Sequence, residues 1–175
     1  MIEYILAIII GVSSSAVASL IFLRFLSRVR PKIIISDQIA KEKSIKGSIS
    51  YRIRVMNKTH RPIMDIKAQL HRVTLIVVPG GTIPKVKEIP LKRSEIMELP
   101  KFDPRDKEAN YAYRFVTYEN VEEIWGDDTK SYLRFRIYAK DSLSGFGEVF
   151  TKNYHTKRNS IKEGSFKVGN FFEIG

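Results

Sequence analysis

The chain has 175 residues, a formal net charge of +11, 43% hydrophobic residues and no cysteine. Without cysteine it has no disulfides, no thiolate metal sites and no cysteine nucleophile. The excess of positive charge favours anionic partners, among them lipid headgroups, nucleic acid and phosphorylated small molecules.

An uncharged run near the N-terminus dominates the sequence. Residues 4–23 carry no charged side chain, and about twenty residues of α-helix cross the hydrocarbon core of a bilayer. Glu3 is the only charged side chain before the run, whereas cations follow it closely at Arg24, Arg28, Arg30 and Lys32. Cations that flank a span stay on the cytoplasmic side, so we expect the N-terminus outside and the rest of the chain in the cytosol.

These rules divide the chain into three parts. Residues 1–27 are predicted to form one transmembrane helix, residues 28–32 a basic juxtamembrane linker, and residues 33–175 the cytosolic domain of a protein of the inner (cytoplasmic) membrane. A cleaved signal peptide is the competing interpretation, with residues 16–18 as its small-residue site. It is disfavoured because the region before the run is acidic and the apolar run continues to residue 23.

The cations after the run have two interpretations that the sequence leaves open. Every single-pass protein needs flanking cations to hold its topology, and Arg24, Arg28, Arg30 and Lys32 satisfy that need. The same side chains also suit anionic lipid headgroups, which contribute about 1 kcal/mol per nearby Lys or Arg. Membrane lipid is therefore one predicted partner.

Small residues recur every four positions along the predicted span, at Ala7, Gly11, Ser15 and Ser19. Within lipid, such a stripe lets two helix backbones approach closely, and serine hydroxyls can bond across the contact. The alternative is that a single span simply tolerates these residues. The stripe predicts a homo-oligomer, and a further hypothesis places several copies around a polar pore.

Alternation of apolar and polar residues predicts strands through most of the remaining chain. The predicted strands are 33–36, 49–55, 63–78 as one long or two broken strands, 86–91, 111–115, 133–139 and 146–154, with two last runs at 165–168 and 171–174. Residues 41–43 are expected to form a charged turn and residues 92–105 a loop. One short helix is predicted at 120–125, capped by Asn120 and closed by Gly126. The pattern favours an all-β fold, an antiparallel sandwich or barrel.

Two predicted strands carry arginines on their polar side, Arg52 with Arg54 and Arg134 with Arg136. Arginines in such positions are usually part of a solvated sheet surface. If both pairs lie on one sheet, they form an anion-attracting stripe with Tyr132 and Tyr138 interleaved. Basic and aromatic side chains combined in this way suit a nucleotide or nucleic acid, because bases stack on aromatic rings.

Nothing in the sequence predicts an enzyme. The three histidines are scattered, without a His-x-x-x-His pair or an acidic partner at ligand spacing. No acid, base and nucleophile assemble in any motif. We therefore expect no catalytic residues, no metal site and no cofactor.

The soluble part resembles the cytoplasmic domain of inward-rectifier potassium channels. The residues that carry the resemblance are the basic stretch and first strand at 28–36, two strands at 51–57 and 65–70, and the final hairpins at 141–145, 154 and 161–166. The resemblance covers residues 24–174 with gaps. It implies an immunoglobulin-like β-sandwich that forms a cytoplasmic ring, a tetramer, and it implies that Arg28, Arg30 and Lys32 contact phosphoinositide headgroups.

The departures from that family limit what the resemblance implies. The chain has one predicted span, without the family's pore helix and selectivity filter, and Met56 replaces the glycine before Asn57. Potassium selectivity is therefore not implied. The leading hypothesis is a single-pass membrane protein whose β-sandwich senses a ligand or drives oligomerisation, forming or gating a pore as a small bacterial effector. The alternative is a membrane-tethered adaptor that recruits a cytosolic protein, a nucleotide or a nucleic acid.

Overall fold

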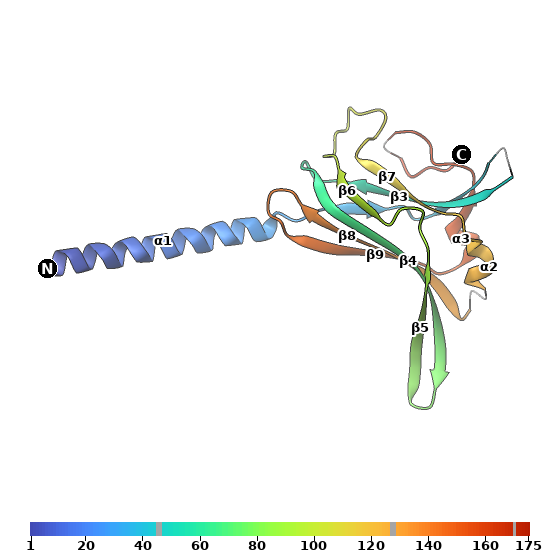
Figure 1. The fold of residues 1–175 in the computed structure, drawn as a ribbon, viewed down its shortest axis with the longest axis horizontal. Helices are drawn as coiled ribbons and strands as arrows, with labels where there is room; N and C mark the ends of the chain where they lie inside the picture. Colours follow the sequence, from blue (N-terminus) through green and yellow to red (C-terminus); the bar gives the residue numbers. More distant parts are fainter. Residues whose placement is uncertain (45–46, 127–128, 170) are drawn as a thin grey trace.

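The computed structural model describes residues 1–44, 47–126, 129–169 and 171–175. A long helix, α1 (Ile2–Arg28), precedes a body built from two β-sheets (Figure 1). The other elements are β1 (Ile33–Ile35), β2 (Ile39–Lys43), β3 (Ile49–Asn57), β4 (Ile63–Val78), β5 (Gly81–Ile89), β6 (Glu95–Leu99), β7 (Ala112–Thr117), α2 (Val121–Trp125), β8 (Ser131–Asp141), β9 (Gly147–Tyr154), α3 (Lys157–Ser160) and β10 (Ile161–Glu163).

Helix α1 confirms the predicted N-terminal helix and stands clear of the body (Figure 1). It is 27 residues long and apolar, and none of its residues is buried, as in a membrane anchor or a signal sequence. It ends at Arg28, two residues before the position that Pro31 disfavours for helix.

Each sheet is organised around one long central strand. In sheet A, β3 pairs with β1 and β2 end to end on one side and with β7 on the other, and β10 lies beyond β2. In sheet B, β4 pairs with β8 on one side and with β5 and β6 on the other, and β9 lies beyond β8. The chain is therefore mostly β, as predicted.

The two sheets share one hydrophobic core. The strongest predicted strand, β8, alternates strictly, with Leu133, Phe135, Ile137 and Ala139 buried and the residues between them more exposed. Phe135 meets Phe115 of sheet A with ring centroids 5.6 Å apart. Burial of such side chains contributes roughly 1.5–3 kcal/mol each, which holds the sheets together.

Three local predictions are wrong because distant contacts decide the structure. Residues 41–43, predicted as a turn, belong to β2, where Lys41 forms an ion pair with Glu122 of α2 at 2.6 Å. The predicted loop at 92–105 contains β6, which pairs with β4. The sheets are not wholly antiparallel, because β10 pairs with β2 in parallel.

Two other predictions agree with the structure. Strand β4 is one long strand, and its pairing shifts register between Met64 and Lys67, where Asp65 has a φ of 51° typical of a bulge. Helix α2 begins as expected, because the Asn120 side chain accepts a hydrogen bond from the Glu123 N–H at 3.3 Å.

Beyond the body, β4 and β5 continue as a two-stranded arm, defined here as residues 73–86 (Figure 1). Strand β8 begins at Ser131, opposite Thr74, so among the residues that the structure describes no third strand pairs with most of the arm. The Pro79–Gly80 turn closes the tip, where Gly80 has a φ of 99°.

Candidate functional site

The predicted linker at 28–32 is attached to the body rather than free of it. The Val29 carbonyl accepts a hydrogen bond from the Ser144 hydroxyl at 2.5 Å, and the Lys32 carbonyl accepts one from the Lys58 N–H at 2.8 Å. Val29 and Pro31 are both buried. Helix α1 is therefore joined to the body with little free chain between them.

A buried carboxylate holds the turn that receives Val29. Asp141 is 0% exposed, and its oxygens accept hydrogen bonds from Arg61 at 2.9 Å and from the N–H groups of Leu143 and Ser144 at 2.9 and 3.1 Å. Burial alone would raise the pKa of Asp141, but Arg61 and the two N–H donors outweigh it and hold the pKa below its usual range. We call Arg61, Asp141, Ser144 and Val29 the junction network.

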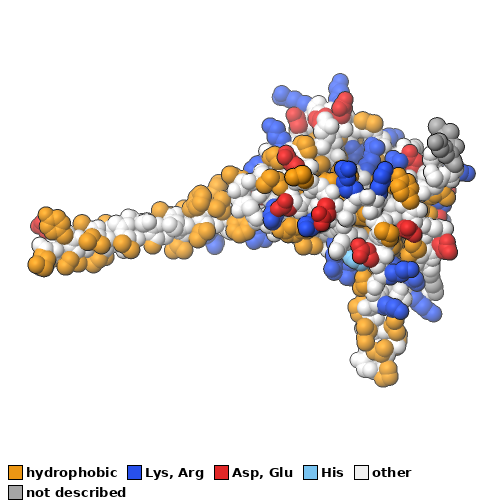
Figure 2. Space-filling view, in the orientation of Figure 1, with side chains coloured by type: hydrophobic (Ala, Val, Ile, Leu, Met, Phe, Trp, Pro, Cys, Tyr) orange, Lys and Arg blue, Asp and Glu red, His pale blue; other side chains and the backbone are white. Residues whose placement is uncertain are grey.

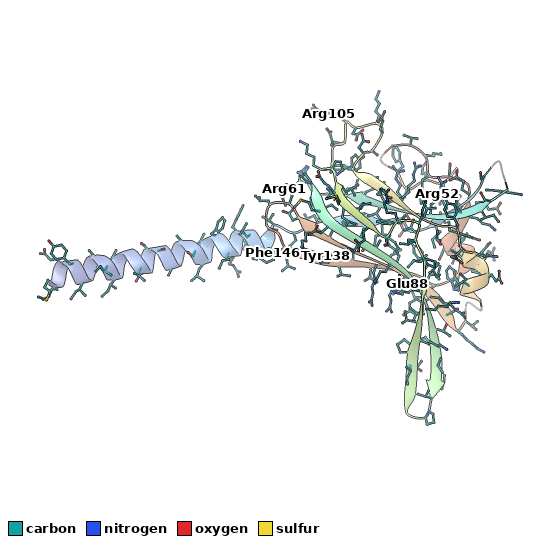
Figure 3. The ribbon with its side chains drawn as sticks, viewed as in Figure 1. Arg52, Arg61, Glu88, Arg105, Tyr138 and Phe146 are labelled. Atoms are coloured by element: carbon teal, nitrogen blue, oxygen red, sulfur yellow. The ribbon has the colours of Figure 1, made fainter. Side chains whose placement is uncertain are left out.

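Figure 3 places Arg61 and Phe146 beside the C-terminal end of α1. The junction network therefore lies where the chain would leave a membrane. Phe146 and Leu143, on the turn between β8 and β9, are 43% and 61% exposed. These apolar side chains extend the apolar surface of α1 onto the body.

The predicted lipid-binding cations all surround this junction. They are exposed, two on the last turns of α1 and two just beyond it, at Arg24, Arg28, Arg30 and Lys32. Within the described part of the chain, none of them lies within ion-pair distance of a carboxylate. Their charge is thus available to anions at this end of the body.

The small-residue stripe remains uncovered along α1. A Cβ built on Gly11 would meet no atom within 4 Å. The neighbouring Ser14 hydroxyl donates to the Gly11 carbonyl at 3.0 Å within its own helix. The stripe positions, all exposed, are Ala7, Gly11, Ser15 and Ser19. The single chain leaves this face open to another helix.

The two arginine pairs do not form one stripe, because they lie on different sheets. Arg52 and Arg54 belong to β3 of sheet A, whereas Arg134 and Arg136 belong to β8 of sheet B. Arg52 already forms an ion pair with Glu42 at 2.5 Å. Alternation along a strand shows which residues share a face, but it does not show which strands share a sheet.

Arg54 is not on a solvated surface, contrary to the sequence prediction. Its side chain lies under the C-terminal segment, and the residue is 2% exposed. The guanidinium donates to the main-chain carbonyls of Lys167 at 2.7 Å, Phe171 at 2.8 Å and Gly169. Burial, with the nearby Arg114, lowers the pKa of Arg54. Arg54 therefore anchors the end of the chain to sheet A.

The other pair lies on the outer surface of sheet B, where a tyrosine flanks it at each end. We call Tyr132, Arg134, Arg136 and Tyr138 the basic–aromatic face. The Arg134 guanidinium carbon lies 5.3 Å from the centre of the Tyr132 ring, and Arg134 also donates to Asn153 at 3.3 Å. These contacts orient the planar guanidinium, and such a group recognises phosphate or stacks on a base.

A histidine adjoins the basic–aromatic face. His71 of β4 lies directly opposite Arg134 in the sheet. Burial lowers the pKa of His71, Glu88 opposes this, and Arg136 and Arg134 add to it. These effects favour the neutral form of His71, and the positive charge here comes from the arginines. In the part of the chain that the structure describes, which leaves out residues 45–46, 127–128 and 170, no three potential metal ligands lie close enough together to hold an ion.

Sequence reasoning missed the junction network and the burial of Arg54. The Asp-Ser-Leu-Ser-Gly sequence at 141–145 signals a turn, and the residues before Pro62 signal another. That the two turns meet, and that Ser144 reaches Val29 over 115 residues of chain, is a consequence of the fold alone.

No family model matches the chain, and no curated protein matches it in sequence. Among solved structures, the chain is similar to the crystal structure of Spo0M, the sporulation control protein from Bacillus subtilis, with a TM-score of 0.39 and 13% identity. The alignment covers 72% of this chain and 49% of that one, so the chain spans about half the length of Spo0M. The resemblance is distant and identifies no family.

The junction network makes a prediction for stability. The Arg61→Ala variant leaves the Asp141 carboxylate buried without its counter-charge. We expect the free energy of unfolding to fall by about 3 kcal/mol, because a broken buried pair costs roughly 3–5 kcal/mol and Arg61 is partly exposed. Chemical denaturation of the full chain in detergent, followed by the fluorescence of the single, buried Trp125, measures this.

The control for Arg61→Ala is Lys140→Ala. It removes a salt bridge to Asp65 of similar length, 2.8 Å, between exposed side chains. We expect no measurable change in the free energy of unfolding for this control. Equal losses in the two variants would contradict the role given to Asp141.

Proposed function

We propose that the chain is a single-pass protein of the inner (cytoplasmic) membrane, with its N-terminus outside, its body in the cytosol and no enzymatic activity. Its copies associate through α1, and the body passes the binding of a ligand or a neighbouring body on to the span. The observation that carries this proposal is the junction network, which joins α1 to the body without a free linker.

Three features support the membrane arrangement. None of the residues of helix α1 is buried, and its apolar side chains are more stable in hydrocarbon than in water. Four cations lie around the end of the span where anionic headgroups would lie, at Arg24, Arg28, Arg30 and Lys32. The interaction of each cation with a headgroup contributes about 1 kcal/mol. The absence of a free linker means that a change in how the bodies pack would tilt or turn the spans.

We also propose a type of β-sandwich and a mode of assembly for the body. Two sheets around one core suit the immunoglobulin-like sandwich of the inward-rectifier cytoplasmic domain. On this proposal the bodies form a cytoplasmic ring, a tetramer as in those channels, and clustered spans form or gate a pore. The uncovered stripe of α1 is the contact between spans.

The stripe is tested by two serine substitutions of identical chemistry. Ser15 lies on the stripe, and Ser13 lies about 200° away around the helix. The Ser15→Leu variant places a large side chain in the contact and is expected to yield monomers. The Ser13→Leu variant is expected to keep the oligomer of the unmodified chain. The measurement is the mass of each full-length variant in lipid nanodiscs.

Either of two results would contradict the proposal. If the unmodified chain is a monomer in nanodiscs, the proposed oligomer does not form. If the oligomer of the Ser15→Leu variant is unchanged, the stripe is not the contact between copies, and the copies associate through the body instead.

A second candidate function rests on the basic–aromatic face. Here the chain is a membrane-tethered adaptor that recruits a cytosolic protein, nucleotide or nucleic acid. The observation that favours it is Arg134, which lies over the Tyr132 ring and is exposed enough to meet a ligand. An aromatic–arginine surface of this kind contributes about 1–3 kcal/mol per stacked base.

The matched test for this face compares Arg134→Gln with Arg52→Gln. Both variants remove one positive charge, but Arg52 lies on sheet A in an ion pair with Glu42. Binding of a fluorescent single-stranded oligonucleotide to the full chain in detergent is expected to weaken roughly tenfold for Arg134→Gln and little for Arg52→Gln. Equal effects, or binding that does not weaken with salt, would count against a specific nucleic-acid site.

A further inference from the structure

The arm carries several exposed apolar side chains that neither the core nor α1 explains. Figure 2 shows hydrophobic side chains over its tip. Leu75, Val77, Ile83 and Val86 are 46%, 84%, 55% and 52% exposed. A soluble surface rarely keeps so many large apolar side chains together unless another surface covers them.

The two faces of the arm differ in charge. Residues directly opposite in an antiparallel pair share a face, so the register assigns each side chain. One face carries only uncharged residues, at Val73, Leu75, Val77, Thr82, Pro84 and Val86. The other face carries Ile76, Ile83 and the cation Lys85, and the pair Arg72 and Lys87 continues this face at the base of the arm. We call these the uncharged face and the cationic face of the arm.

Pro84 interrupts the outer edge of β5 against strand addition. The Leu75 N–H donates to the Lys130 carbonyl, away from β5, so Leu75 and its partner Pro84 form a pair without mutual hydrogen bonds. The nitrogen of Pro84 therefore points to the outer edge, where it offers no N–H to another strand. A partner is expected to contact the faces of the arm, not its edge.

From these observations we infer that the uncharged face of the arm packs against the same face of a second copy of the chain, across a two-fold axis. Such a contact is self-complementary, and it keeps Lys85 of each arm, with Arg72 and Lys87 at its base, on the opposite face, where they do not repel across the interface. A contact through the cationic faces would bring like charges together. The charge pattern thus selects the face.

The position of the arm agrees with a second copy as its partner. The arm projects sideways from the body, away from the line of α1 (Figure 1). If α1 crosses a bilayer, as the proposed function holds, the arms of neighbouring copies extend over the membrane surface toward one another. Glu88, at the base of the arm, is labelled in Figure 3 and shows where the arm leaves the body.

One arm face is too small to hold a dimer by itself. A stable protein interface buries about 1,200–2,000 Å² in total, more than two narrow ribbons supply. Anchoring both copies in one membrane raises their effective concentration and lets a weak contact form. The contact is therefore expected in membranes and lost in dilute detergent.

The chain has no cysteine, so introduced cysteines report the contact directly. Leu75→Cys lies on the uncharged face, and Ile76→Cys lies next to it on the cationic face with similar exposure, 46% against 40%. Full-length variants at low density in liposomes are oxidised and separated without reductant. We expect about tenfold more dimer from Leu75→Cys than from Ile76→Cys, because tethering raises the collision rate of both variants equally but only Leu75 lies in the proposed contact.

Several outcomes would overturn the inference. Equal cross-linking of the two variants would indicate random collision. If neither variant is cross-linked, the uncharged faces of two copies do not contact each other. A fluorophore on Leu75→Cys that is quenched by brominated lipids would show that the bilayer covers the arm instead.

The mass of the same variants in nanodiscs separates this inference from the proposed function on which it rests. An oligomer without the Leu75→Cys cross-link refutes the arm contact and leaves the association of spans standing. A monomeric chain without the cross-link refutes both. A cross-link that survives Ser15→Leu shows that the arm contact forms without the stripe.

Discussion

The buried carboxylate of Asp141 decides where α1 leaves the body. A carboxylate with no exposure to water is tolerated only when charge and hydrogen bonds compensate for its desolvation, and Arg61 with two N–H groups provides both. This fixes the turn after β8, and Ser144 of that turn holds Val29. Every other surface of the body, including the basic–aromatic face and the arm, has a defined position relative to α1 because of this connection.

The positive charge of the chain is divided among different tasks. Arg54 anchors the C-terminal segment, and Arg52, Arg61 and Lys41 each neutralise a carboxylate. The net charge of +11 therefore does not mark one large anion site. Charge available to partners is concentrated in separate places, around the end of α1, on the basic–aromatic face and at the base of the arm, which favours several contacts over one dominant ligand.

Local sequence signals predicted the elements that local interactions decide. Helix α1, the alternating strands β3 and β8, and the cap of α2 by Asn120 all followed from periodicity or turn chemistry. Strands β2 and β6 were missed because charged or loop-like residues become strands only when β3 and β4 pair with them. The burial of Arg54 was equally invisible, since its partners lie more than 110 residues later in the chain. The condition for a stripe of four arginines, that both pairs lie on one sheet, is not met for the same reason, because strand order is set by the whole fold.

The proposed coupling between α1 and the body is tested most directly by a distance across their junction. Spin labels at Ile21→Cys on α1 and Gln69→Cys on sheet B, both exposed, report that distance in nanodiscs when labelled chains are diluted with unlabelled ones. We expect one narrow distance distribution for the otherwise unmodified chain, and a clearly broader one when Asp141→Asn is added. A distribution that is equally broad with and without Asp141→Asn would show that α1 swings freely, and would contradict the coupling of the body to the span.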